Sequence, residues 1–219
     1  SLGLKLDAIR QGLRTFDTTF YQAPGRMNIY DEHPFKVLFD YGHNAHAVSA
    51  LADLAGRLDV AGRRIVVLAG PGDRRDEDLR AIAQAVAGRF DHYICRRDDN
   101  LRERAPDEVP RIMAAALVAA GVPQSSISQI PDEQEAVDAA LRMGRPGDLV
   151  LIFADALVRS WKQIIYFRPE GAPPQATTAA PAPVTTQVVE TPVENAAPLS
   201  LEGLIRDERG IRYAPEASD

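Results

Sequence analysis

The sequence predicts an α/β fold, a Rossmann-like, mostly parallel six-stranded sheet with one antiparallel edge strand and helices on both faces. Between Arg26 and Trp161, short apolar segments alternate with longer amphipathic ones, which is typical of a parallel sheet whose strands are joined by helices. Only Asp31–Pro34 separates the first two apolar segments, and such a turn-like connection favours an antiparallel hairpin at one edge.

The order of these segments gives the expected elements. Strands are expected near residues 27–31, 36–40, 64–69, 91–95, 126–130 and 148–153. Helices are expected near residues 44–58, 76–88, 106–120, 132–143 and 155–162. Apolar residues at helical spacing predict one more helix over residues 2–16. Residues 169–198, rich in Pro, Ala and Thr, are expected to form a disordered linker, and residues 199–219 a short segment with a brief helix or strand.

Composition limits the possible partners and locations. The chain has 219 residues, a net charge of −6 and one cysteine, which excludes an intrachain disulfide and a cysteine metal cluster. Its basic residues are interleaved with acids, as at Asp73–Glu77, so no nucleic acid partner is expected. The sequence has no stretch of about 18 apolar residues and no signal-peptide pattern, so we expect a cytoplasmic protein without a membrane partner.

The most informative motif is Asp40-Tyr41-Gly42-His43-Asn44, between an apolar strand-like segment and an Ala/Leu-rich helical segment. A polar cluster at the carboxyl end of a strand, opening onto a helix N-terminus, suits an anionic ligand. Asp40 is a candidate for ribose hydroxyls or a metal-bound water, and His43 and Asn44 for ligand oxygens, so all three are candidate catalytic residues. The alternative is that Asn44 only caps the helix and Asp40 is a turn residue.

Three further features bear on the site. Arg26, in a Pro-Gly-Arg segment, can pair bidentately with a phosphate, or be a surface arginine in a turn. The mixed-charge loop Arg96–Arg104 suits an amino acid ligand, or is a solvated charge run. His43 and His46 lack further partners of metal-ligating type, so no metal site is expected.

The glycine-rich loop Gly70–Arg75 matches neither common nucleotide motif. The chain contains no Gly-x-x-x-x-Gly-Lys-Ser/Thr sequence, and Arg75 occupies the third glycine position of Gly-x-Gly-x-x-Gly. The alternative is a tight turn before a charged helix start. We therefore expect the main phosphate-binding loop of any nucleotide site to lie outside this chain.

These motifs, in this order, resemble the carboxyl-terminal domain of the Mur family of ATP-dependent amide ligases. In that family the arginine of a Pro-Gly-Arg-like segment and the aspartate of an Asp-Tyr-x-His-Asn-Pro-like motif help to close the site around ATP. The matching residues here are Arg26 and Asp40, with His43 and Asn44 in the corresponding positions and Ala45 in place of the proline.

A second motif of the family concerns the incoming amino acid. The muramyl ligase that adds a diamino acid carries Asp-Asn-Pro-Arg in its selecting loop, and this chain has Asp99-Asn100-Leu101-Arg102. Leucine in place of proline suggests a different substrate. The resemblance implies that Asp99, Asn100 and Arg102 bind the amino acid, and that Arg26, Asp40 and Asn44 bind the nucleotide.

Within the Mur family, the sequence is most similar to the cyanophycin synthetases, on the segments Gly72–Leu79, Arg97–Asp99 and Ala154–Phe167. The resemblance implies that residues 1–22 are the terminal helix and linker of a preceding Mur-type central domain. Residues 23–168 are then the Mur-ligase carboxyl-terminal domain, which acts as a lid lobe.

This branch implies a specific reaction. The lobe belongs to the module that adds arginine to the aspartate β-carboxylate of a polyaspartate backbone through an acyl phosphate. ATP and Mg²⁺ are implied cofactors held mainly by a domain outside this chain, so this chain alone is expected to be inactive. The implied partners are the preceding central ATPase domain, an ATP-grasp module that adds aspartate, the growing polymer and free arginine, in a homo-oligomeric enzyme.

Two alternatives remain open at this stage. One is another Mur-family ligase, of the peptidoglycan or folylpolyglutamate type. The other is a non-catalytic Rossmann-like interaction module, in which Arg26, Asp40, His43 and Arg102 need not converge.

Overall fold

The computed structural model describes residues 19–169 and the two strands at 204–207 and 210–213. The chain divides into two compact units, residues 1–173 and residues 174–219. The predicted helix over residues 2–16 and the predicted linker over 169–198 lie outside the described residues, except for Pro169.

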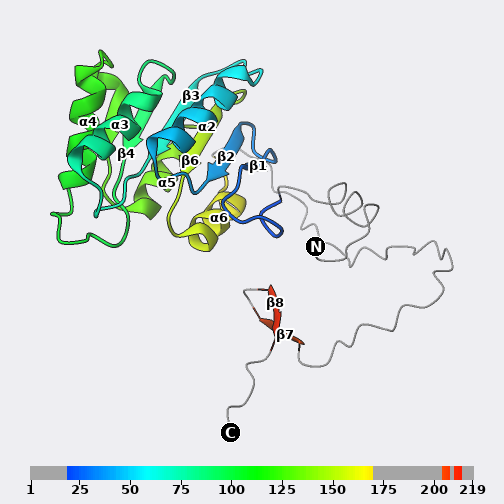
Figure 1. Ribbon diagram of the computed structural model, residues 1–219. Helices are drawn as coiled ribbons and strands as arrows, with labels where there is room; N and C mark the ends of the chain where they lie inside the picture. The colour runs from blue at the N-terminus through cyan, green and yellow to red at the C-terminus, as the bar shows by residue number, and fades with distance from the viewer. Residues whose placement is uncertain (1–18, 170–203, 208–209, 214–219) are drawn as a thin grey trace, which may run out of the picture. The chain divides into compact units, whose positions relative to one another are not determined.

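The first unit is built on a six-stranded sheet with the order β1-β2-β6-β3-β4-β5 (Figure 1). Its strands are β1 (Asn28–Tyr30), β2 (Lys36–Asp40), β3 (Arg64–Leu68), β4 (His92–Cys95), β5 (Ile127–Gln129) and β6 (Leu149–Phe153). β1 pairs antiparallel with β2 at one edge, and all the other pairs are parallel. The predicted fold class is therefore confirmed, including the antiparallel edge strand.

Helices cover both faces of this sheet. They are α2 (Ala45–Arg57), α3 (Asp76–Val86), α4 (Glu108–Ala119), α5 (Glu133–Met143) and α6 (Leu157–Tyr166), with the short 3₁₀ turn Gln124–Ser126 before β5. The buried side chains of α2, α3 and α4 form one core cluster, and those of α5 and α6 form a second cluster on the other face.

The central strands form because both of their faces are buried. In β6 all five residues are buried, and the same holds for four of the five residues of β3, a run of Ile, Val and Leu. Continuous β-branched and leucine runs of this kind are typical of strands in a parallel sheet covered by helices on both sides. The sequence signal for these strands is strong for this physical reason.

One helix ends later than predicted. Periodicity indicated an end near residue 162, but α6 continues to Tyr166. Ile164 is fully buried against the second core cluster, and its carbonyl oxygen lies 2.9 Å from Nε2 of His33 in the β1–β2 turn. Tertiary packing therefore extends the helix by one turn.

The second unit contains a two-stranded antiparallel pair, β7 (Leu204–Asp207) and β8 (Gly210–Tyr213). The sequence had indicated a brief helix or strand in this segment, and the structure has strands. Among the described residues, no helix has the length and apolar character needed to span a membrane.

Candidate functional site at the carboxyl edge of the sheet

The carboxyl ends of the five parallel strands lie at one edge of the sheet, which we call the carboxyl edge. β6 lies between β2 and β3, and its following helix α6 packs on the face opposite to α2 and α3. In open α/β sheets a ligand-binding crevice forms where neighbouring connections leave toward opposite faces. The loops after β2, β6 and β3 therefore surround the expected binding crevice.

Asp40, at the end of β2, ties two of these loops together. It is 8% exposed, its Oδ2 accepts a hydrogen bond from the backbone N of Met27 at 2.8 Å, and its Oδ1 accepts one from the backbone N of Gly42 at 2.7 Å. Met27 has a positive φ of 52°, an uncommon conformation for a residue with a side chain. The carboxylate thus fixes the turn before β1 against the turn after β2.

Arg26 and His43 both lie beside the ring of Tyr41. The Arg26 guanidinium carbon is 5.9 Å from the centre of the Tyr41 ring, and the His43 ring is 5.1 Å from the same ring. Nδ1 of His43 is 3.3 Å from the Tyr41 carbonyl oxygen. Arg26 is exposed, so its guanidinium is accessible to an anion. The structure therefore brings Arg26, Asp40 and His43 together.

Asn44 has a clear structural task. It is the N-cap of α2, and its Oδ1 accepts a hydrogen bond from the backbone N of Ala47 at 3.0 Å. The capping role considered from the sequence is therefore present, although Asn44 is also exposed at the same turn. His46 is exposed on the first turn of the same helix.

A buried ion pair lies under the loops after β4 and β6. Arg96 and Glu133 are both fully buried, and Nη1 of Arg96 is 3.0 Å from Oε2 of Glu133. Arg96 Nη2 also donates to the Phe153 carbonyl at 2.8 Å. Glu133 in turn accepts hydrogen bonds from the backbone N of Asp155 and from the hydroxyl of Ser160.

Sequence reasoning missed this pair. Glu133 is one of two acids in the first turn of α5, and Arg96 begins the mixed-charge loop. No local signal distinguished them, because their burial depends on three strands meeting. The pair joins the end of β4, the end of β6 and the N-termini of α5 and α6.

Asp98 is the inward-facing carboxylate of the loop after β4. Its side chain is 16% exposed and lies 3.4 Å from Arg96. Burial raises the pKa of Asp98 to about 6, opposed by Arg96 and His43 and reinforced by the neighbouring charges of Asp155 and Glu133. A carboxyl group perturbed by burial in a crevice is a typical property of a functional site.

The three residues predicted to bind the amino acid lie beyond β4. Asp99 pairs with Arg159 at 2.7 Å, Arg102 pairs with Asp73 at 3.0 Å, and Asn100 accepts a hydrogen bond from the backbone N of Arg102 at 3.2 Å. Their strand is three positions from β2 in the sheet, a separation of roughly 14 Å. The predicted residues thus form two groups on the carboxyl edge.

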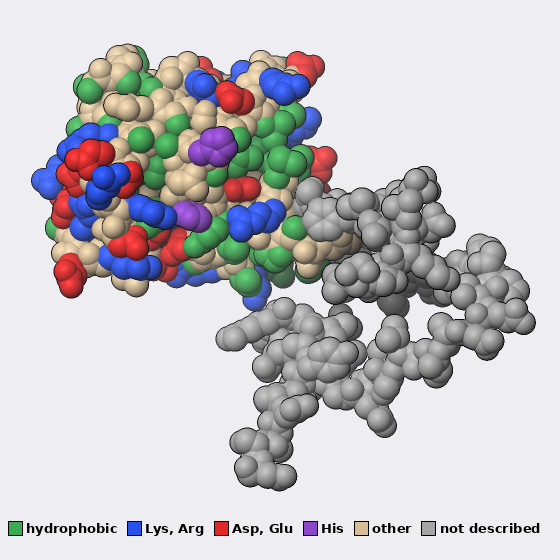
Figure 2. Space-filling view, viewed as in Figure 1, with side chains coloured by type: hydrophobic (Ala, Val, Ile, Leu, Met, Phe, Trp, Pro, Cys, Tyr) green, Lys and Arg blue, Asp and Glu red, His purple; other side chains and the backbone are tan. Residues whose placement is uncertain are grey.

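The surface charge is mixed in sign. Figure 2 shows Lys and Arg side chains interleaved with Asp and Glu side chains on one face, rather than a region of a single sign. Within the described residues no group of three or more His, Cys, Asp or Glu side chains is arranged to hold a metal ion.

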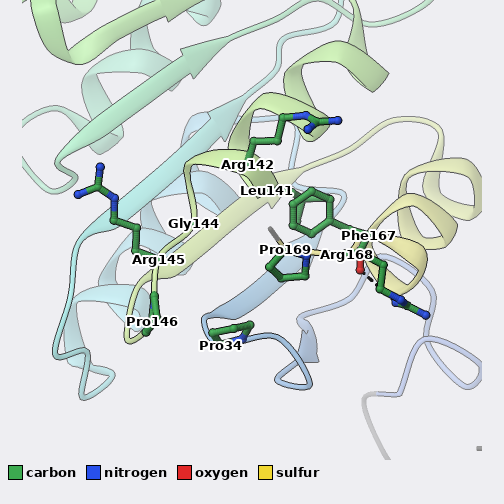
Figure 3. A pocket seen from close by; sticks show the side chains of 9 residues that line it. All are labelled: Pro34, Leu141, Arg142, Gly144, Arg145, Pro146, Phe167, Arg168 and Pro169. Atoms are coloured by element: carbon green, nitrogen blue, oxygen red, sulfur yellow. Dashed lines mark hydrogen bonds between the residues drawn. The ribbon is translucent and has the colours of Figure 1, made fainter. Parts of the chain in front are cut away.

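A hollow of about 350 Å³ lies at the opposite edge, between Pro34 and the ends of α5 and α6 (Figure 3). Figure 3 shows that the guanidinium groups of Arg142, Arg145 and Arg168 diverge rather than converge. Arg142 pairs with Asp138, and Arg168 donates to the carbonyl oxygens of Ile165 and Phe167. Basic residues there offset the negative ends of two helix dipoles, which is a structural role.

Comparison with known proteins places the chain in a family. The model of the Mur ligase, glutamate ligase domain, matches residues 25–156. Cyanophycin synthetase of Geminocystis herdmanii is 38% identical over 162 residues, which cover 74% of this chain and 18% of that protein. The chain thus spans about a fifth of the length of this curated relative.

More distant relatives belong to the same family. UDP-N-acetylmuramoyl-L-alanyl-D-glutamate–2,6-diaminopimelate ligase of Solibacter usitatus is 29% identical over 155 residues, 69% of this chain and 29% of that protein. The structure of E. coli FolC in complex with ADP, without folate substrate, superposes with a TM-score of 0.57 at 22% identity, over 75% of this chain and 36% of that one. This second likeness supports the fold.

The resemblance predicted from the motifs is confirmed at the level of the family and of the cyanophycin synthetases as relatives. The matched region contains the whole carboxyl edge, from the Arg26 turn to the start of the loop after β6. The chain belongs to the Mur ligase family, as a member with its glutamate ligase domain.

Proposed function

We propose that this chain is the carboxyl-terminal lobe of an ATP-dependent ligase that adds arginine to the aspartate β-carboxylate of a polyaspartate backbone. The observation that carries the proposal is the similarity to cyanophycin synthetases across the residues that form the carboxyl edge. In this proposed reaction the γ-phosphoryl group of ATP passes to the carboxylate and ADP is released, and the amino group of arginine then displaces inorganic phosphate from the acyl phosphate to form the amide. The lobe closes over a nucleotide held mainly by another domain.

Arg26 and Asp40 form the nucleotide side of this lobe. Arg26 is exposed and can pair with a phosphate oxygen, because its guanidinium rests on the Tyr41 ring with its donors free to face outward. Asp40 accepts two backbone hydrogen bonds, so we assign it to holding the Arg26 and His43 turns in position. In this proposal His43 and Asn44, in the turn between β2 and α2, orient the phosphate or ribose groups of the nucleotide.

The loop after β4 forms the amino acid side. Arg102 is exposed and carries the positive charge needed to bind the α-carboxylate of the amino acid. Asp98 and Asp99 carry the negative charge needed to bind its cationic group. The strands that lead into the two sides, β2 and β4, are roughly 14 Å apart, which suits a site that brings two substrates together. Closure of the lobe then excludes water from the reacting groups.

The remaining parts of the enzyme belong to the proposal. Mg²⁺ and the phosphate-binding loop are assigned to the preceding Mur-type central domain, because the described residues hold no suitable ligand cluster and the sequence contains no P-loop motif. An ATP-grasp module adds aspartate to the growing polymer. The assembled enzyme is proposed to be a homo-oligomer in the cytoplasm.

The test is amino-acid-dependent phosphate release by the full-length ligase that carries this lobe. Arginine, diaminopimelate and glutamate are compared in turn, each with ATP and a polyaspartate primer. Release only with arginine supports the proposal. Release with diaminopimelate or glutamate instead assigns the lobe to another branch of the family, and no release with any of them rejects a ligase.

A pair of variants tests the nucleotide side. Arg26→Ala should raise the KM for ATP about tenfold, because a charge-assisted phosphate contact is lost. Arg57→Ala is the matched control, since Arg57 is also exposed but lies in the last turn of α2, at the far end of that helix. Equal KM values for ATP in the two variants would show that Arg26 does not bind the nucleotide.

A further inference from the structure

Arg104 joins the two loops that border the amino acid side. Its Nε donates to the Gly72 carbonyl at 2.8 Å, and its Nη2 donates to the Arg74 carbonyl at 2.7 Å. Its Nη1 donates to Asp76 at 2.9 Å and to Glu108 at 2.6 Å. One side chain therefore holds the glycine-rich loop, the first turn of α3 and the first turn of α4.

The two loops also touch through their backbones. A Cβ atom added at Gly72 would lie 2.9 Å from the Leu101 carbonyl carbon and would clash with its oxygen. Only glycine permits this approach without a shift of one loop. The Leu101 carbonyl group thus lies against Gly72, and its oxygen accepts a hydrogen bond from the backbone N of Arg104 at 3.1 Å.

The backbone between these contacts is strained. Arg102 has a φ of 48° and Glu103 a φ of 72°, so two consecutive residues with side chains adopt the left-handed conformation. Such conformations persist only where the surroundings impose them, and they cluster at functional sites. Here the backbone N of Arg104, the next residue along the chain, donates to the Leu101 carbonyl oxygen at 3.1 Å, and the Arg104 side chain anchors this end of the segment to the glycine-rich loop.

Arg104 is engaged within the protein on all three of its nitrogen atoms, so it is not available to bind a substrate. Its side chain is 16% exposed, whereas that of Arg102 is 51% exposed. The two arginines thus have different roles. Arg102 faces solvent beside Asp73, whereas Arg104 holds the backbone that presents Arg102.

We infer that Arg104 is the positioning residue for recognition of the incoming amino acid, because it holds the strained Asn100–Glu103 segment in the conformation that presents Arg102. This inference rests on the proposed function, since it concerns the same ligation site. It adds a residue that makes no substrate contact. A fork of donors is required, because a lysine at this position cannot reach four acceptors in these directions.

The experiment compares Arg104→Lys with Arg80→Lys in the full-length ligase. Arg80 is the matched control because it also pairs with Asp76, at 3.2 Å, but it makes that pair along α3 and holds neither loop. Arg104→Lys should raise the KM for arginine about tenfold or more, because small displacements of positioning groups are costly. The KM for ATP should stay within about twofold of the unsubstituted enzyme, and Arg80→Lys should leave both values unchanged.

A second variant reaches the same segment by another contact. Gly72→Ala displaces Leu101 without removing any charge, and it should give the same selective rise in the KM for arginine. If Arg104→Lys does not fold, the result with Gly72→Ala decides the question.

The inference is overturned if the KM for arginine is unchanged in Arg104→Lys, or if the KM values for arginine and ATP rise together. Failure of the proposed function is distinct from both results. It appears in the unsubstituted enzyme, as the absence of arginine-dependent phosphate release, before any variant is measured.

Discussion

The amino edge and the carboxyl edge of the sheet each hold an aspartate largely shielded from solvent, Asp148 before β6 and Asp98 after β4, and the two carboxylates differ in how their charge is satisfied. At the amino end, Asp148 is 4% exposed and accepts hydrogen bonds from the backbone N of Arg63 at 2.7 Å, from its guanidinium at 2.7 Å and from the backbone N of Arg145 at 3.0 Å. At the carboxyl edge, Asp98 lies 3.4 Å from Arg96 and close to two other carboxylates.

The pKa values of the two carboxyl groups shift in opposite directions. For Asp148, burial raises the pKa, but the hydrogen bonds from Arg63 and Arg145 outweigh it and hold the pKa below its usual value. For Asp98, burial dominates and raises the pKa to about 6. The Asp148 carboxylate, whose charge is balanced by hydrogen bonds, stabilises the fold. The Asp98 carboxylate, whose charge is only partly balanced, is available to a ligand.

The largest effect should come from breaking the buried pair under the carboxyl edge. Glu133→Ala leaves the Arg96 charge buried without its partner and should lower the free energy of unfolding by about 3–5 kcal/mol. The double variant Arg96→Met with Glu133→Leu should lose less than Glu133→Ala alone, because it buries no charge. Urea denaturation measures all three proteins, and a larger loss in the double variant would contradict this account of the pair.

Asp148→Asn tests the contribution of the carboxylate at the amino end of β6. It should lower the free energy of unfolding at pH 7 by about 2–3 kcal/mol, since hydrogen bonds to a charged group are lost. Because the pKa of Asp148 is depressed in the folded state, its stabilisation is present above the unfolded pKa and disappears as the pH falls through the folded pKa.

Unfolding curves recorded between pH 7 and pH 3 measure this effect. The difference between the Asp148→Asn variant and the unsubstituted protein should shrink as the solution is acidified. A difference that does not depend on pH would show that the charge of Asp148 does not contribute.

Asn44→Ala should give a smaller effect, a loss of about 1 kcal/mol, because the N-cap of α2 is removed. Asn44→Asp keeps a capping oxygen and should keep the stability. Thermal unfolding measures the stability that the N-cap contributes, and the KM for ATP of the full-length ligase shows whether Asn44 also contributes to ATP binding. If Asn44→Asp keeps both values, Asn44 serves only as a cap.

The sequence predicted the sheet well because its signals are local. Runs such as Ile65–Leu68 are buried on both faces, and the Asp31–Pro34 turn leaves no room for a crossover, so strand type and the antiparallel edge follow from short segments. The end of α6 was missed because the burial of Ile164 depends on the distant β1–β2 turn.

The site was predictable only in part for the same reason. Arg26, Asp40 and His43 stand out because they occur at strand ends, where the topology brings them together. Glu133 and Arg96 do not stand out, since nothing in a sequence shows that two charged residues are fully buried. The roles of Arg26, Asp40, His43, Asn44, Asp99, Asn100 and Arg102 as ligand-binding residues stay predictions.

The most direct measurement is the free energy of unfolding of Asp98→Asn at pH 7. With its pKa raised to about 6, Asp98 destabilises the folded state when ionised, and this cost appears as the pH rises from its unfolded pKa through the folded value. The variant should therefore be more stable than the unsubstituted protein at pH 7, by up to about 3 kcal/mol, and this gain should vanish at pH 4. An equal or lower stability at pH 7 would contradict the claim that the carboxyl edge keeps an undercompensated charge.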